Sequence, residues 1–207
     1  MPSTAITLRT VSGQALRAHL DDLASLRIAV FREWPYLYDG DEAYERRYIA
    51  RYAEARGAAA VIACDGERVV GVSTCLPLAE EDEEISAPFR DAGWDLASVF
   101  YFGESVLLPR YRGSGIGVAF FREREAWAKR FPGIAWAAFC AVERDPADPR
   151  RPPGYVPLDG FWRNRGYEKR PDLACTLEWR EIGAAEEIPH RLCFWLKRLR
   201  DTPCHSV

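Results

Sequence analysis

The sequence has little histidine and no paired cysteine motif. Its three histidines are His19, His190 and His205, and none lies at a metal-ligand spacing from another. Its six cysteines are Cys64, Cys75, Cys140, Cys175, Cys193 and Cys204, and no two of them form a Cys-x-x-Cys pair. Three lie inside apolar, strand-like runs, so we expect buried reduced thiols, no disulfide framework and no metal site.

Long apolar runs and basic blocks are also absent. No stretch approaches the roughly 20 apolar residues that a membrane-spanning helix needs, and residues 1–9 lack the apolar core of a secretion signal. The 28 basic and 31 acidic residues give a formal charge of −3, with no basic cluster of the kind that binds nucleic acid. We therefore expect a soluble, cytoplasmic protein with neither a membrane nor a nucleic acid as partner.

The chain is rich in core-forming residues. Of its 207 residues, 48% are hydrophobic and 13% aromatic, which predicts one domain over 1–207 with a sizeable core. The apolar periodicities predict strands over 6–9, 58–63, 68–76, 99–108, 134–142, 173–180 and 190–198, and helices over 13–31, 42–55, 115–131 and 158–165. Residues 80–84 are expected to form an acidic loop, and 145–157, with five prolines, a long loop.

Segment 107–117 carries the clearest functional signal. Three alternating glycines, Gly113, Gly115 and Gly117, lie between a predicted strand and a predicted helix. Glycine lets a ligand approach the backbone closely, and the first turn of a helix offers free N–H donors and a partial positive charge. With Arg110 and Arg112 beside it, this turn is typical of a phosphate site.

The spacing narrows the choice of phosphate ligand. A nucleotide-binding loop would need Gly-Lys-Ser/Thr, which is absent, and a dinucleotide fingerprint begun at Gly113 would need glycine where Val118 stands. The pattern Arg112-x-x-Gly115-x-Gly117, with Leu-Leu-Pro-x-Tyr before it, resembles the acyl-CoA pyrophosphate loop of the GNAT superfamily of N-acetyltransferases. The alternative is a tight turn whose glycines serve packing only, but packing alone requires neither this spacing nor the positive flank.

This resemblance implies a fold, a co-substrate and a reaction. The fold is α/β, with a twisted, mostly antiparallel mixed sheet, helices on both faces, and strands 99–108 and 134–142 splaying apart. Acetyl-CoA or another acyl-CoA would be the co-substrate, without a metal. Its pantetheine arm would pair with the backbone of Leu107 and Leu108. Its pyrophosphate would bind at Arg112, Gly113, Ser114, Gly115, Ile116 and Gly117. An acetyl or short acyl group would pass directly to a primary amine of a small molecule or peptide.

Glu104 is the expected general base. It is the only charged residue between Val99 and Pro109, on the strand that would hold the thioester. Many GNAT members place an acid near this point, and a carboxylate there can have its pKa raised toward neutrality. The alternative is a strand acid that faces solvent or forms an ion pair.

The general acid departs from the family pattern. The GNAT family pattern here is Asn-x-x-Ala-x-x-Phe-Tyr, whose tyrosine donates the proton. This chain has Tyr155-x-x-Leu158-x-x-Phe161-Trp162 at the matching positions, so a tryptophan replaces that tyrosine. Indole is no useful acid, which leaves Tyr155, Cys140 or solvent to protonate the thiolate and predicts a structural role for Trp162. This departure also supports the alternative function, a catalytically inactive acyl-CoA sensor or scaffold.

The acceptor side is expected from segments that border the family's acceptor cleft. They contain Trp34, Tyr36, Tyr38, Asp39, Asp41, Arg150 and Arg151. Acidic residues 80–84 would attract a cationic amine, unless they form a solvated loop. The sequence fits a monomer and a homodimer equally.

Overall fold

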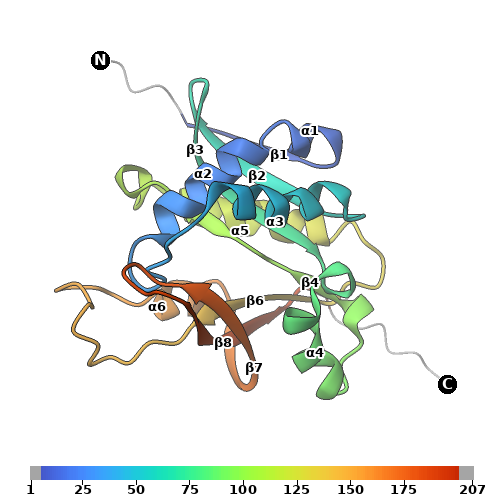
Figure 1. Cartoon of the computed structure of the whole chain (residues 1–207). Coiled ribbons are helices and arrows are strands. Elements are labelled where there is room, and N and C mark those ends of the chain that lie inside the picture. The colour runs from blue at the N-terminus through green and yellow to red at the C-terminus, as the bar shows by residue number, and fades with distance from the viewer. Residues whose placement is uncertain (1–5, 201–207) are drawn as a thin grey trace.

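Strands from both halves of the chain form one twisted mixed sheet. The computed structural model describes residues 6–200, so Cys204 and His205 lie outside the described part. The strands are β1 (Thr7–Val11), β2 (Ala59–Asp65), β3 (Arg68–Pro77), β4 (Val99–Tyr101), β5 (Ser105–Leu107), β6 (Trp136–Val142), β7 (Glu168–Arg180) and β8 (Glu187–Arg198). Their order is β1-β2-β3-β4-β6-β8-β7, with β5 paired to β3, and only β4 and β6 pair in parallel (Figure 1).

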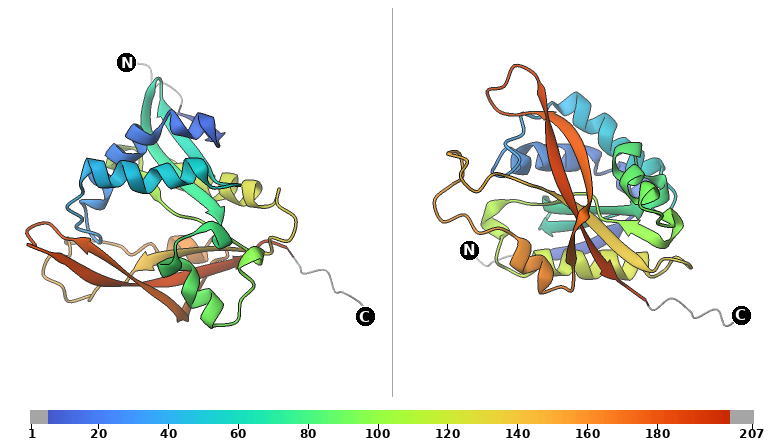
Figure 2. Two further views of the ribbon diagram at one scale, coloured as in Figure 1. Left: turned by 45° about the vertical axis from the view of Figure 1, so that its right-hand side comes forward. Right: turned by 90° about the horizontal axis from the view of Figure 1, so that it is seen from below.

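Helices cover both faces of this sheet. The helices are α1 (Gln14–Arg17), α2 (Leu20–Phe31), α3 (Glu42–Glu54), α4 (Glu83–Asp91), α5 (Ile116–Ala128) and α6 (Asp159–Arg163). Helices α1 to α4 contribute Leu16, Leu23, Ile49 and Phe89 to the core on one face. Helix α5 covers the other face, where Phe121 packs with strand aromatics (Figures 1 and 2). The predicted α/β fold with a mixed sheet is therefore confirmed.

The segment 99–108 is two strands separated by a β-bulge, and not the single strand expected. Tyr101 pairs with Leu76 and Ser105 with Ser73, so three residues on this segment face two on β3. Gly103 N–H donates to the Thr74 carbonyl (3.1 Å), and Thr74 N–H donates to the carbonyl of the next residue, Glu104 (2.9 Å). The extra residue bends the strand, as bulges beside functional sites often do.

Two further expectations need correction. The helix expected over 13–31 is two helices with a break at residues 18–19; the apolar spacing runs through the break because Leu16 and Leu23 still face the same core. The acidic stretch 80–84 is no open loop. It includes the start of α4, whose apolar face carries Ile85 and Phe89, and the acidic run together with Pro88 hid this helix.

The described residues show no disulfide, no metal-binding cluster and no membrane-spanning helix. Of the five cysteines within residues 6–200, all are unpaired and four are buried. The same residues contain no group of three His, Cys, Asp or Glu placed to hold a metal ion. None of their helices is long and apolar enough to cross a bilayer.

Candidate active site

The glycine turn joins β5 to α5. A short 3-10 turn at Pro109–Tyr111 follows β5, and Gly113 and Gly115 then take positive φ values of 76° and 88°. Left-handed backbone of this kind strains residues with a Cβ. A Cβ at either glycine would meet no atom within 4 Å, so the turn faces open space. Gly115 precedes α5 without a side-chain cap, which leaves the first backbone N–H groups of α5 available to an anion.

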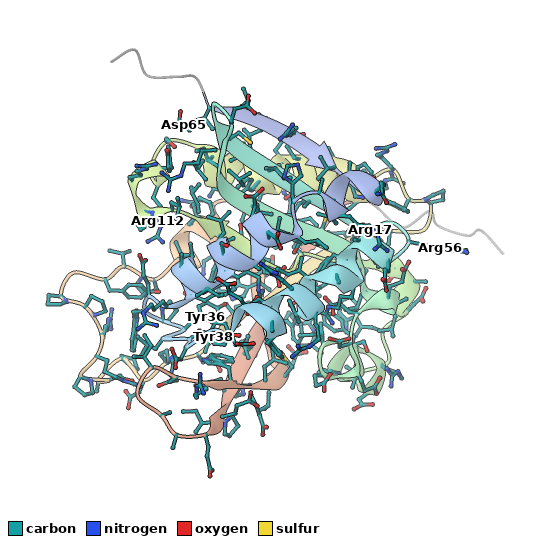
Figure 3. The ribbon with its side chains drawn as sticks, turned by 45° about the horizontal axis from the view of Figure 1, so that its top comes forward. Arg17, Tyr36, Tyr38, Arg56, Asp65 and Arg112 are labelled. Carbon is teal, nitrogen blue, oxygen red and sulfur yellow. The ribbon has the colours of Figure 1, made fainter. Side chains whose placement is uncertain are left out.

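Arg112 is fixed beside this turn. Its Nε donates to the carbonyl of Leu107 (3.2 Å), and its Nη1 donates to Glu33, which follows α2 (2.8 Å). The guanidinium is therefore held between the end of β5 and the segment after α2. Arg112 is labelled in Figure 3. Gly117 has a different function from the two turn glycines, because a Cβ there would lie 3.3 Å from the Phe161 ring. It lets α6 approach α5.

The sheet opens beyond the paired residues of β4 and β6. β4 pairs with β6 from Val99 to Tyr101, and Phe102 N–H still donates to the carbonyl of Ala138 (2.7 Å). Beyond the bulge, β5 pairs with β3 alone, while β6 continues with β8 alone. Within residues 6–200, the facing edges of β5 and β6 therefore carry no neighbouring strand. This slot leads along Leu107 to the glycine turn, as expected for the splayed pair.

A large cleft also reaches the bulge. Its volume is about 1110 Å³, and it lies between α2, the segment that follows α2, α3, α4, and the hairpin of β7 and β8. Its inner end includes Gly103, Glu104, Tyr101 and Cys140. Its aromatic lining consists of Phe31, Tyr36, Tyr38, Tyr44, Tyr48, Tyr101 and Trp179, and its charged lining of Arg27, Asp39, Asp41, Asp82, Glu84, Glu104, Glu178, Arg180, Glu186 and Glu187.

Glu104 is buried and fully engaged at the inner end of the cleft. Its carboxylate forms an ion pair with Arg27 of α2 and accepts a hydrogen bond from the Thr74 hydroxyl (2.5 Å). Arg27 also forms an ion pair with Glu45 of α3, whose side chain is wholly buried. Two carboxylates therefore share one guanidinium beneath the bulge.

This network lowers the pKa of Glu104. Burial alone would raise it, but the positive charge of Arg27 and the hydrogen bond from Thr74 outweigh burial, so the pKa lies below its usual value. The expectation of a raised pKa is thus wrong. An ion-pair partner 77 positions away in the chain is the reason. Glu104 lines the cleft as an ionised carboxylate that can accept a proton or a hydrogen bond.

The segment after α2 forms one wall of the cleft. Asp39 N–H donates to the Arg180 carbonyl (2.9 Å), and Ile182 N–H donates to the Leu37 carbonyl (2.8 Å). The indole N–H of Trp179 donates to the Tyr36 carbonyl (3.0 Å). These bonds join the wall to the β7–β8 hairpin, and both Tyr36 and Tyr38, labelled in Figure 3, line the cleft.

Tyrosines surround the inner end of the cleft in their protonated form. Burial raises the pKa of Tyr36 well above its usual value, and the nearby Cys140 thiol adds to the shift. Tyr101 donates to, or accepts from, the Cys140 sulfur at 3.1 Å, and burial raises its pKa too. The sequence reasoning placed Tyr36 near the acceptor but did not identify its proximity to Cys140 and Glu104.

Tyr155 and Trp162 lie in different surroundings. Tyr155 is half-buried with its ring edge on Trp34, the centroids 6.1 Å apart. It is not among the described residues that line the cleft, yet it lies close enough to Tyr36 to raise the pKa of that phenol. Trp162 packs against Phe139 (5.1 Å) and Trp195 (5.0 Å), on the face opposite α2 and α3. Arg150 and Arg151 do not line the cleft either; Arg150 pairs with Glu181.

Comparison with known proteins gives no match by sequence. No family model matches the chain, and no curated protein matches it. Solved structures do match. An acetyltransferase of the GNAT family from Streptococcus pneumoniae aligns with a TM-score of 0.56 and 12% identity, covering 94% of this chain and 99% of its own. The chain has the GNAT fold.

Two further matches show ligands on this fold. YncA from Salmonella typhimurium, solved with its cofactor acetyl-CoA, aligns with a TM-score of 0.58 and 12% identity over 98% of this chain and 99% of its own. Arabidopsis thaliana NAA60, solved with a bisubstrate analogue, aligns with a TM-score of 0.58 and 13% identity over 95% of this chain and 100% of its own. At these identities the likeness concerns the GNAT fold and not the substrate.

Proposed function

We propose that this protein is an N-acyltransferase that moves an acetyl or short acyl group from acyl-CoA to a primary amine. The observation that carries the proposal is the junction at Gly103 and Glu104. There the slot between β5 and β6 and the cleft lined by Glu104 both reach the bulge. A thioester in the slot and an amine in the cleft would meet at this point, which favours direct attack in a ternary complex.

Backbone groups near the glycine turn support an acyl-CoA co-substrate. The open edge of β5 at Leu107 faces the slot, so Leu107 would pair with the pantetheine arm, whereas the Leu108 N–H, also expected there, already donates to the Val70 carbonyl (3.0 Å). The uncapped start of α5 at Gly115 offers N–H donors to the pyrophosphate. Arg112 adds a positive charge beside these donors. Once bound, acyl-CoA supplies an activated thioester, and the protein's own groups orient the amine and accept its proton.

Glu104 is the proposed proton acceptor. As its pKa is lowered, it is ionised at neutral pH and acts as a hydrogen-bond acceptor that orients the amine and takes its proton as the new bond forms. The leaving thiolate, with a pKa of about 8.5, takes its proton from solvent or from a neighbouring phenol. Tyr155, or Tyr36 at the cleft itself, would supply that proton.

A paired assay tests the function. Thiol release from acetyl-CoA is measured against a panel of primary amines, and CoA binding is measured by calorimetry on the same preparation. Amine-dependent thiol release with product of the expected mass supports the acyltransferase. CoA binding without turnover of any amine would instead favour the acyl-CoA sensor.

A further inference from the structure

Arg124 of α5 is a buried cation without a counterion. Its exposed fraction is 1%, and no other arginine or lysine among residues 6–200 is buried. Each buried acid in the same range has an arginine partner; these acids are Glu45, Glu104 and Glu181. Arg124 forms no ion pair within those residues, and the neighbouring Glu125 pairs with Lys197 instead. A buried charge without a partner costs stability, so packing alone does not favour arginine at this position.

The guanidinium of Arg124 lies where the slot begins. Its Nη1 donates to the Thr74 carbonyl (3.4 Å), which also accepts from the N–H of Gly103 (3.1 Å). Its Nε donates to the Phe120 carbonyl one turn back along α5 (3.3 Å). Its Cζ lies 4.4 Å from the centroid of the Phe102 ring, and the Phe102 N–H is bonded to β6. The positive charge therefore lies against the residue from which β5 and β6 diverge.

Opposite charges flank the bulge on the two faces of the sheet. The Glu104 carboxylate meets Arg27 of α2, whereas Arg124 belongs to α5, which covers the other face (Figure 1). Thr74 lies between them, because its hydroxyl donates to Glu104 and its carbonyl accepts from Arg124. Arg27 is shared by Glu104 and Glu45, which leaves one net negative charge in that group. The bulge thus has a negative side toward α2 and a positive side toward α5.

This polarity matches the charges that develop in the proposed reaction. The attacking nitrogen gains positive charge, and the carbonyl oxygen and then the sulfur of the thioester gain negative charge. A fixed charge in a water-excluded interior stabilises such a change strongly and needs no reorganisation. Arginine keeps its proton even when buried. Trp162 packs in the core cluster of the α5 face that also contains Phe102, but its indole cannot protonate a thiolate, so the sulfur needs another source of stabilisation.

We infer that the positive charge of Arg124 stabilises the leaving thiolate of CoA from behind the Phe102 ring. This inference rests on the proposed function. The N–C bond forms, the C–S bond breaks with its electron pair on sulfur, and Glu104 takes the proton of the amine. The thiolate then takes a proton from solvent. Arg124 transfers no proton and acts through the field of its charge alone.

The ionisation of bound CoA measures this effect directly. Reduced CoA is bound to the protein, and the ultraviolet absorbance of its thiolate is followed as pH is raised. We expect the thiol pKa to lie below the value of about 8.5 for a free thiol, and to rise by about one unit or more in Arg124→Met. Arg122→Met removes an exposed charge from the same helix and should keep the wild-type thiol pKa. Equal thiol pKa values in wild type and Arg124→Met would overturn the inference.

Stability and kinetics distinguish this role from packing. The urea midpoint of Arg124→Met should equal or exceed that of wild type, because a buried unpaired charge is removed. The value of kcat should fall about tenfold, as one unit of thiol pKa implies, while KM for acyl-CoA changes by less than about threefold. Arg124→Gln keeps an N–H donor without the charge and should raise the thiol pKa as methionine does, which covers the case of a methionine variant that does not fold. A lower midpoint with unchanged thiol ionisation would assign Arg124 to packing and overturn the inference.

The thiol titration also separates this inference from the proposed function, because it needs no acceptor. Turnover of amines with the same thiol pKa in wild type and Arg124→Met would leave the acyltransferase standing and overturn the role of Arg124. A thiol pKa that depends on Arg124, without acyl transfer to any amine, would support the effect on the sulfur and contradict the acyltransferase. A folded protein that binds no CoA would contradict both.

Discussion

Arg27 and Glu104 form an ion pair that joins α2 to the bulge between β4 and β5, 77 positions along the chain. The same guanidinium holds Glu45 of α3. The pair therefore fixes Glu104 at the inner end of the cleft and keeps it ionised. Because it is held as a carboxylate, Glu104 is a weak base at rest and accepts the amine's proton only as the new bond forms.

Replacing Glu104 tests that role. Glu104→Gln keeps the shape of the side chain but removes the proton acceptor, so turnover should fall by about 100-fold while CoA affinity stays near wild type. Glu45→Gln removes the other carboxylate on Arg27 without touching the described cleft lining, and should reduce turnover far less. The role of Glu104 would be refuted by equal losses in the two variants.

The pH dependence of kcat/KM should reflect the lowered pKa of Glu104. Because the pKa of Glu104 is lowered from 4.5, its deprotonation is complete well below neutral pH. The rise of kcat/KM through neutral and alkaline pH should therefore follow the pKa of the acceptor amine and shift when the amine is changed. A limb near pH 6 to 7 that is common to all amines would point to another base.

Gly115 tests the phosphate site. Gly115→Asp places a negative charge at the uncapped start of α5, where φ is 88°. Repulsion should weaken CoA binding by well over tenfold, on the order of a few kcal/mol. Gly115→Asn is the matched control, since asparagine tolerates left-handed backbone and carries no charge. Calorimetry should rank the affinities as wild type, then asparagine, then aspartate; equal affinities in folded variants would refute the site.

Local patterns explain which features could be predicted. The glycine turn, the strand before it and the helix after it depend on adjacent residues, so segment 107–117 predicted them. The bulge at Gly103 was missed because it depends on pairing with β3, which the strand itself does not reveal. Helix α4 was missed because its acidic start resembles a loop, although Ile85 and Phe89 are spaced for a helix.

The cleft is formed by contacts between segments that are far apart in the sequence, so no local pattern predicts it. Backbone hydrogen bonds between Leu37 and Ile182, and between Asp39 and Arg180, bring the wall and the hairpin together. Of the seven residues expected on the acceptor side, four line the cleft, namely Tyr36, Tyr38, Asp39 and Asp41. Trp34, Arg150 and Arg151 are not in its lining. No sequence pattern indicated Glu178 or Glu187, because exposed strand acids have no distinctive spacing.

Gly103 is packed too tightly for a side chain. A Cβ there would lie 2.3 Å from the Tyr52 hydroxyl and 2.6 Å from the Thr74 hydroxyl. Gly103→Ala should therefore destabilise the protein by about 1–3 kcal/mol in urea unfolding. Tyr52→Phe removes one of the clashing atoms, so the double variant should lose less stability than the two single variants together. Strict additivity would mean that the clash is relieved elsewhere.

Glu81 should make stability depend on pH. Burial raises its pKa from 4.5 to about 7, although Arg51 and the Tyr52 hydroxyl oppose the shift. The folded state thus holds a proton that the unfolded state releases, so this contribution is full below pH 4.5 and is lost as pH rises through 7. The loss amounts to about 3 kcal/mol.

Glu81→Gln cannot release that proton. Measured by urea unfolding from pH 4.5 to 8, its stability relative to wild type should rise by about 3 kcal/mol. Glu80→Gln, at the exposed neighbouring position, controls for loss of a charge and should run parallel to wild type. A stability difference between Glu81→Gln and wild type that stays constant with pH would show that Glu81 ionises normally.

Trp162 and Tyr155 separate packing from proton donation. The rings of Phe139 and Trp195 lie 5.1 and 5.0 Å from Trp162, so Trp162→Tyr should cost about 1 kcal/mol or more of stability and leave turnover nearly intact.

Burial raises the pKa of Tyr155 above 10, so its phenol keeps a proton to give. Tyr155→Phe should lower kcat with CoA affinity preserved if this phenol is the donor. Tyr36→Phe tests the phenol that lines the cleft itself. Unchanged kcat in both phenylalanine variants would make solvent the donor, and a many-fold gain in Trp162→Tyr would mark position 162 as a lost acid and favour the sensor.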